Sequence, residues 1–208
     1  MKAVMLSIKP KYCELIASGK KIVEVRKTRP NIDTPFKSYI YCTKGKFALL
    51  RDDEDKSERY KRECWNRAIF HEKCGKTILN CKVIGEFVCD KIYQYTTCDI
   101  KDGVDISDED MTRLSCLTKD EIKDYELSPG KFGVFGWHIS DLVIYDKPKE
   151  LSEFYRYCGD NPKCENCPFV YFESNESIGT YEECSSPIEE YCKPLTCPPQ
   201  SWCYVEEE

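Results

Sequence analysis

Residues 19–26 read GKKIVEVR, and this stretch decides the fold that we expect for the chain. Apolar and charged residues alternate through residues 21–27, which predicts a β-strand. Side chains two residues apart share one face of a strand, so Glu24 and Arg26 should point together and Lys21 to the opposite face. Glu24 and Arg26 therefore form either a surface salt bridge or part of a binding site.

The segments next to this stretch predict the first half of a small domain. Residues 2–8, KAVMLSI, are rich in aliphatic side chains and predict a strand. Pro10 suits the first turn of the helix that follows, and Gly19 suits the cap that ends it. Aromatic and β-branched residues predict a further strand over residues 38–43.

The middle of the chain is harder to interpret. Residues 51–75 are dense in charge, which fits either a helix over the second half or a long exposed insertion. Apolar residues return over residues 76–93 and predict one long strand, with a bulge or bend at Gly85. Ser107 and Thr118 each precede an acidic residue by three positions, and this capping-box spacing predicts two short helices.

The last segments add strands rather than helices. Residues 130–148 predict two strands joined by a turn at Ser140 and Asp141, and residues 201–206, SWCYVE, predict a final strand that returns to the domain. Many strands with few short helices predict an α+β fold, built as a small closed or half-closed β-barrel.

The 208 residues are 41% hydrophobic and 33% charged, as expected of a globular protein. We expect one domain over residues 1–150, in which residues 51–75 are a possible insertion. Residues 151–197 form a cysteine-rich irregular lobe, and residues 198–208 hold the returning strand and an acidic tail.

Charge and hydropathy limit the classes of partner that the chain is expected to bind. No apolar stretch approaches the roughly 18–20 residues of a membrane span, and the sequence predicts a cytoplasmic protein without a membrane partner. Residues 1–50 hold eleven Lys and Arg against three acids, a balance of +8 within a chain of net charge −6. An acidic chain argues against tight nonspecific binding of duplex nucleic acid, whereas a local basic cleft for one phosphate or a short strand fits this distribution.

The motif G-x-K-x-x-E-x-R, here Gly19, Lys21, Glu24 and Arg26, follows a strand and a glycine-capped helix. In this order it resembles the ASCH domain, a branch of the PUA-like superfamily of small β-barrels. The resemblance covers roughly residues 1–50, 76–148 and 198–206. The resemblance implies a cleft beside the barrel that binds RNA or a modified nucleotide.

The resemblance and simple chemistry together select the candidate binding residues. Lysine and arginine can contact phosphates, a carboxylate can accept from a base amino group, and an aromatic ring can stack on an unpaired base. The nucleic-acid-binding set is Lys9, Lys21, Glu24, Arg26, Trp137 and His138. A core or barrel-rim position is the alternative interpretation of Trp137, and a structural role is the alternative for His138.

Two other functions remain open at this point. One branch of the family resembles an amidohydrolase that acts on an acylated cytidine through a lysine, a threonine and a glutamate. This chain has Glu24 at the threonine position, so Glu24 or Glu86 would have to act as the base, with Lys21 as electrostatic partner. A protein-interaction adaptor is the third possibility.

Cysteines are concentrated near the end of the chain. Of the 15 in the sequence, Cys158, Cys164 and Cys167 have the spacing C-x5-C-x2-C, which favours a structural zinc site. The fourth ligand is Cys192 or, with a smaller loop, Cys184. Free surface thiols are the alternative interpretation.

The zinc interpretation predicts a stoichiometry. Protein purified without added metal should contain about one zinc per chain by elemental analysis, as four thiolates make a closed tetrahedral site. Cys164→Ser should abolish the zinc content. Metal-free protein whose residues 151–197 resist protease under reducing conditions would contradict the assignment.

Overall fold

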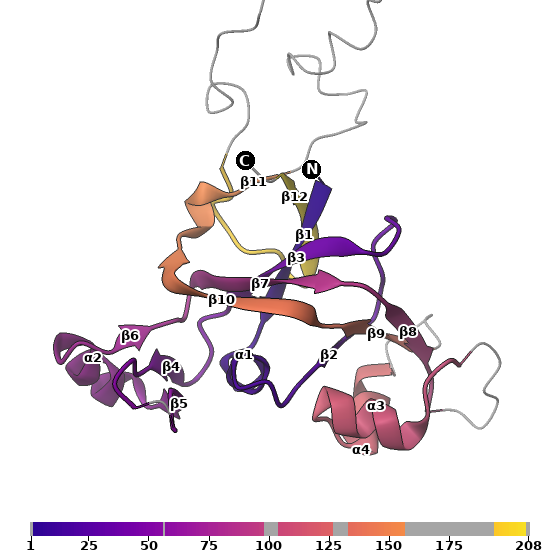
Figure 1. Ribbon diagram of the computed structural model, residues 1–208, viewed down its shortest axis with the longest axis horizontal. Helices are drawn as coiled ribbons and strands as arrows, with labels where there is room; N and C mark the ends of the chain where they lie inside the picture. Colours follow the sequence, from indigo (N-terminus) through magenta and orange to yellow (C-terminus); the bar gives the residue numbers. More distant parts are fainter. Residues whose placement is uncertain (1, 56, 98–103, 127–132, 157–193, 207–208) are drawn as a thin grey trace, which may run out of the picture.

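The computed structural model describes residues 2–55, 57–97, 104–126, 133–156 and 194–206 (Figure 1). Within these ranges the fold is mixed α+β, with a six-stranded sheet at its centre and two three-stranded sheets. The six strands, in spatial order, are β10 (Ser140–Lys149), β7 (Lys82–Cys89), β3 (Phe36–Cys42), β1 (Lys2–Ile8), β12 (Trp202–Glu206) and β11 (Tyr155–Arg156). β1 and β3 are parallel, and the other pairs in this sheet are antiparallel.

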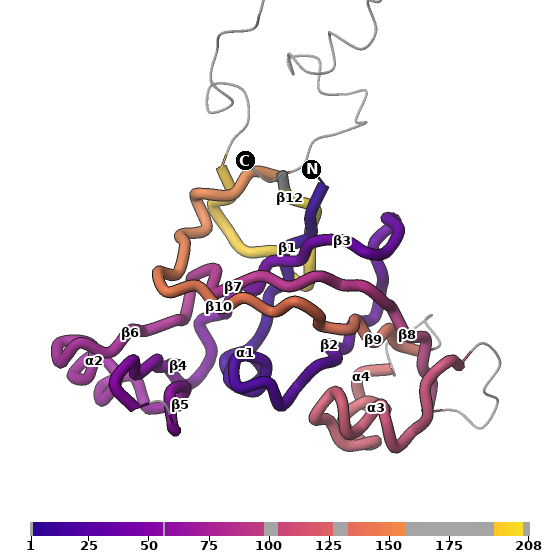
Figure 2. Tube along the Cα trace, in the orientation of Figure 1, coloured from indigo at the N-terminus to yellow at the C-terminus, as the bar shows by residue number. Residues whose placement is uncertain are grey.

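The two smaller sheets lie towards opposite ends of the molecule, as the tube of Figure 2 shows. One contains β2 (Val23–Arg26), β9 (Val134–His138) and β8 (Ile92–Tyr95), and the other contains β5 (Tyr60–Glu63), β4 (Ala48–Arg51) and β6 (Thr77–Ile78). The helices are α1 (Pro10–Ala17), α2 (Trp65–Lys73), α3 (Asp108–Ser115), α4 (Lys119–Glu126) and the short 3-10 helix η1 (Leu151–Glu153). None of the helices in the described ranges is both long and apolar enough to span a bilayer.

β1 runs through the middle of the core and divides it into two layers. Val4, Leu6 and Ile8 pack into the main cluster, which α1 covers with Cys13 and Ile16. The alternate β1 residues pack into a second cluster with Phe154 and Val205 on the other face of the sheet. Because β1 is buried on both faces, it fixes the position of α1 and of the residues that follow.

Several elements agree with the sequence analysis. The first strand, its helix and the returning strand are confirmed as β1, α1 and β12, and α2 occupies the second half of residues 51–75. Ser107 caps α3 by accepting a hydrogen bond from the Asp110 amide at 3.0 Å. The expected bulge at Gly85 is confirmed, because Gly85 pairs with Ile40 whereas Val83 pairs with the next residue of β3.

Two expectations about the strands are wrong. No sheet within the described residues closes on itself, so the closed form of the expected β-barrel is absent there, and the strands form three separate sheets. The single strand expected over residues 76–93 is three strands, β6, β7 and β8. The first break occurs at Asn80 and Cys81. The buried side chain of Asn80 forms hydrogen bonds with the backbone of Thr43 and Leu49, and Cys81 adopts a φ of +63°.

Candidate functional site

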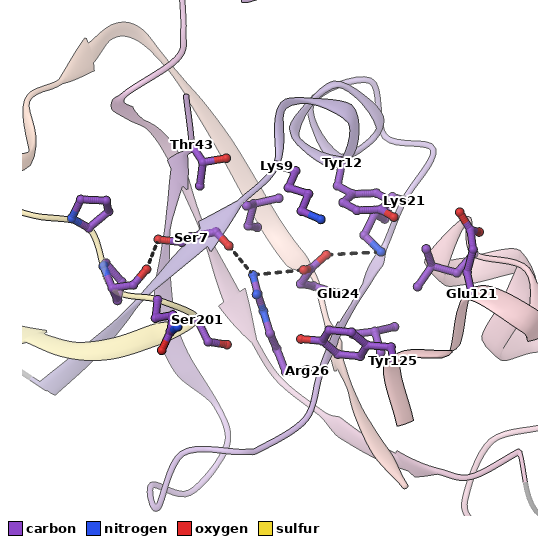
Figure 3. A pocket seen from close by; sticks show the side chains of 16 residues that line it. Ser7, Lys9, Tyr12, Lys21, Glu24, Arg26, Thr43, Glu121, Tyr125 and Ser201 are labelled. Carbon is purple, nitrogen blue, oxygen red and sulfur yellow. Dashed lines mark hydrogen bonds and ion pairs between the residues drawn. The ribbon is translucent and has the colours of Figure 1, made fainter. Parts of the chain in front are cut away.

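A cavity of about 390 Å³ opens between α1, β2, α4 and the segment that precedes β12. Figure 3 shows the side chains that line it. The lining residues are Ser7, Ile8, Lys9, Tyr12, Lys21, Glu24, Val25, Arg26, Thr43, Leu117, Glu121, Tyr125, Pro198, Pro199, Gln200 and Ser201. The volume lies within the range of small-ligand sites, near its lower end.

The end of α1 directs Lys21 into this cavity. Gly19 has a φ of +71°, a left-handed conformation that glycine adopts without strain. The amides of Lys20 and Lys21 donate to the carbonyl of Leu15 at 2.9 and 3.0 Å, and this turns the chain back across the helix end. Lys21 therefore precedes β2 and does not follow the face alternation of that strand.

Lys21, Glu24 and Arg26 meet in one row at the floor of the cavity, which we call the charged triad (Figure 3). Glu24 Oε2 lies 3.3 Å from Lys21 Nζ, and Glu24 Oε1 lies 3.1 Å from Arg26 Nη2. The three residues are 1%, 5% and 7% exposed. Two cations and one carboxylate leave this buried row with a formal charge of +1.

Backbone carbonyls from two other elements hold the cations of the triad. Lys21 Nζ donates to the carbonyl of Ser115, the last residue of α3, at 2.7 Å. Arg26 Nη2 donates to the carbonyl of Ser7 in β1 at 2.9 Å. These bonds fix the direction of both side chains, so the floor is already organised before a ligand arrives.

Hydrogen bonding within the triad is incomplete. Arg26 Nε is buried and has no hydrogen-bond partner in the described part of the chain, and Glu24 Oε2 has only its ion pair with Lys21 Nζ. An unsatisfied buried polar group costs about 1–3 kcal/mol. A ligand with both donors and acceptors can compensate for this cost when it enters the cavity and the side chains adjust to it.

Two tyrosines supply the aromatic walls. Tyr12 comes from α1 and Tyr125 from α4, and Figure 3 shows their rings on either side of Glu24. Burial raises the pKa of Tyr12. The charges of Glu121 and Glu24 raise this pKa further, whereas the charge of Lys11 lowers it. Its phenol is therefore protonated at neutral pH and can donate a hydrogen bond.

The C-terminal segment forms the remaining wall. The amide of Ser7 donates to the carbonyl of Ser201 at 3.0 Å, and the Ser7 hydroxyl donates to the carbonyl of Pro199 at 2.6 Å. Residues 198–201 are thereby fixed against β1 at the edge of the cavity. Residues from both ends of the chain line the same site.

The structure brings together four of the six expected binding residues: Lys9, Lys21, Glu24 and Arg26. Trp137 is 0% exposed and packs in the core against Phe36, with 5.6 Å between ring centroids. It does not line the cavity, which matches the core alternative.

His138 and Glu86 also lie outside the cavity lining. His138 Nδ1 is 2.6 Å from Asp90 Oδ1, in the bend between β7 and β8. Glu86 accepts a hydrogen bond from the Tyr145 hydroxyl and pairs with Lys37 Nζ at 3.3 Å. Of the two carboxylates considered as a base, only Glu24 is in the cavity.

The proposed zinc ligands Cys158, Cys164, Cys167 and Cys192, and the alternative Cys184, lie outside the described residues. Within the described ranges, no group of three or more His, Cys, Asp or Glu side chains is placed to hold a metal ion. The zinc assignment therefore stays a prediction.

No protein-family model and no curated protein matches the chain. Among solved structures, the chain is similar to ASCH from Zymomonas mobilis, with a TM-score of 0.45 and 18% identity over 72% of this chain and 73% of that chain. Two structures of mutants of that protein have TM-scores of 0.39 and 0.42, at 16% and 13% identity. The matches to these two structures cover 73% and 99% of this chain, and 77% and 89% of the mutant chains.

Proposed function

We propose that the cavity binds one unpaired nucleotide, either in RNA or as a modified nucleotide. The observation that carries this proposal is the buried charged triad beside an open cavity, in which Arg26 Nε has no hydrogen-bond partner among the described residues. A base edge presents donors and acceptors side by side, which is the pattern that a carboxylate between two cations can pair with.

Each part of the cavity has a role in this proposal. The carboxylate of Glu24 accepts from an exocyclic amino group, while Lys21 and Arg26 donate to carbonyl or ring-nitrogen acceptors. Tyr12 and Tyr125 supply ring faces for stacking on the base. The formal charge of +1 on the floor favours a ligand that is rich in acceptors or negatively charged.

The hydrolase alternative uses the same cavity. Lys21 Nζ lies 3.3 Å from Glu24 Oε2, so a base and a cation are adjacent, as hydrolysis of an acylated base would need. Both oxygens of Glu24 already face cations, however, and this favours recognition over proton abstraction. Product chromatography after incubation with N4-acetylcytidine distinguishes the hydrolase from the binding protein. Turnover by the wild type above that of a Glu24→Gln control would support the hydrolase.

Replacing Tyr125 should weaken nucleotide binding. Stacking of one base on an aromatic side chain contributes about 1–3 kcal/mol, so Tyr125→Ala should raise the Kd by roughly 5- to 150-fold. The measurement is equilibrium binding of a panel of short single-stranded RNAs and of modified and unmodified nucleosides.

Tyr93→Ala is the matched control for this experiment. Tyr93 and Tyr125 pack partly buried against the same core cluster, but only Tyr125 lines the cavity. The control should therefore bind the panel like the wild type. Equal losses in both variants, or a wild type that binds no member of the panel, would reject the proposed function.

A further inference from the structure

Lys9 and two lysines of a neighbouring loop take no part in the triad. Residues 43–47, TKGKF, connect β3 to β4, and we call them the lysine loop. Thr43 lines the cavity, and Lys44 and Lys46 are exposed. Lys9, at the start of α1, is also exposed and lines the cavity (Figure 3).

A buried asparagine determines the shape of the lysine loop. Asn80 is 4% exposed, and its Nδ2 lies within hydrogen-bond distance of the carbonyls of Thr43, Lys44 and Phe47, at 3.1, 2.6 and 3.1 Å. Its Oδ1 accepts from the amide of Leu49 at 2.6 Å. The loop therefore presents its carbonyls to the interior, while the lysine side chains remain exposed to solvent.

Contact with α1 places the loop beside Lys9. Gly45 has a φ of +61°, and a Cβ atom at this position would lie 2.7 Å from Cγ of Pro10. The backbone of the loop can approach this closely only because residue 45 is glycine. Gly45 lies between Lys44 and Lys46, and Pro10 follows Lys9. The contact between Gly45 and Pro10 therefore brings the lysine loop close to the start of α1.

The charges of these three lysines are not neutralised locally. Lys11 on the same helix pairs with Glu121 at 3.4 Å. Lys9, Lys44 and Lys46, by contrast, have no acidic partner among the residues that the structure describes. Lys9 in the cavity lining and two exposed lysines on a loop that packs against Pro10 therefore form a positively charged surface next to the cavity, which favours negative charge.

We propose that Lys9 and the lysine loop bind backbone phosphates of the nucleotides next to the one held in the cavity. The ligand is then a single-stranded polynucleotide rather than a free nucleoside. This inference rests on the proposed function and deepens it. The triad recognises one base, and the three lysines bind the strand on which that base is carried.

The test compares a strand with its own nucleosides. One probe is a mixed-sequence single-stranded RNA of about ten nucleotides, and the other is the nucleoside mixture from complete digestion of the same RNA. The double variant Lys44→Gln, Lys46→Gln should bind the RNA roughly 10-fold more weakly at about 0.1 M salt. The slope of log affinity against log salt should fall by about 1.4, since each phosphate contact on a single strand contributes about 0.7. Nucleoside affinity should be unchanged.

The control removes the same charge elsewhere. Lys73→Gln, Lys147→Gln alters two exposed lysines of α2 and β10 that are absent from the cavity lining, and it should leave the salt slope as in the wild type. The inference is overturned if both double variants bind the RNA alike. It is also overturned if the wild type binds the RNA no tighter than the nucleosides, although the proposed function survives that result. Failure of the wild type to bind either probe would remove the proposed function itself.

Discussion

Replacing Glu24 by glutamine should lower the free energy of unfolding by about 3–5 kcal/mol. The substitution keeps the shape of the side chain but removes the only negative charge of the triad. Lys21 and Arg26, at 1% and 7% exposed, are then left as buried cations without a counter-charge. Chemical denaturation followed by tryptophan fluorescence measures the change, and the slope of the transition should stay constant.

Glu121→Gln is the matched control for the Glu24 substitution. Glu121 lies in the wall of the same cavity and pairs with Lys11 at 3.4 Å, but its side chain is 41% exposed. An exposed ion pair contributes about 0–1 kcal/mol, so this variant should unfold close to the wild type. If Glu24→Gln costs no more than Glu121→Gln, the triad is not a coupled buried unit and its charges are solvated in the folded protein.

The sequence predicted which three residues form the triad but not how their side chains are arranged. Spacing along a strand placed Glu24 and Arg26 on one face, and the structure pairs them. The same spacing placed Lys21 on the opposite face, whereas its ammonium contacts Glu24. The difference arises because β2 begins at Val23, so Lys21 belongs to the turn after α1, where strand periodicity does not apply.

The walls of the cavity could not be predicted from local pattern. Tyr12, Thr43, Tyr125 and Ser201 are far apart in the sequence and meet only through the packing of α1, β3, α4 and the C-terminal segment. None belongs to a motif with a fixed spacing. Asn80 is a similar case, because nothing in its neighbourhood indicates that it organises a loop more than 30 residues earlier.

Trp137→Ala should destabilise the fold by about 3–5 kcal/mol, the usual cost of removing a large buried aromatic side chain. Trp137 is fully buried in the main cluster and contacts Phe36 and Trp202, with ring centroids 5.6 and 6.0 Å apart. Its Nε1 has no hydrogen-bond partner among the described residues, so the loss comes from packing alone. Denaturant unfolding measures it against Trp65→Ala, which alters a partly buried tryptophan in a separate cluster and should cost less.

A binding measurement on the same variant separates a core role from ligand contact. At a denaturant-free, low-temperature condition where Trp137→Ala remains folded, it should bind single-stranded RNA like the wild type, because the indole does not line the cavity. Tyr125→Ala should show the opposite combination, with weak binding and a smaller loss of stability. A large loss of affinity in Trp137→Ala at unchanged stability would contradict a role in the core alone, and the indole, whose residue pairs with Glu24 across β2 and β9, would then belong to the binding site.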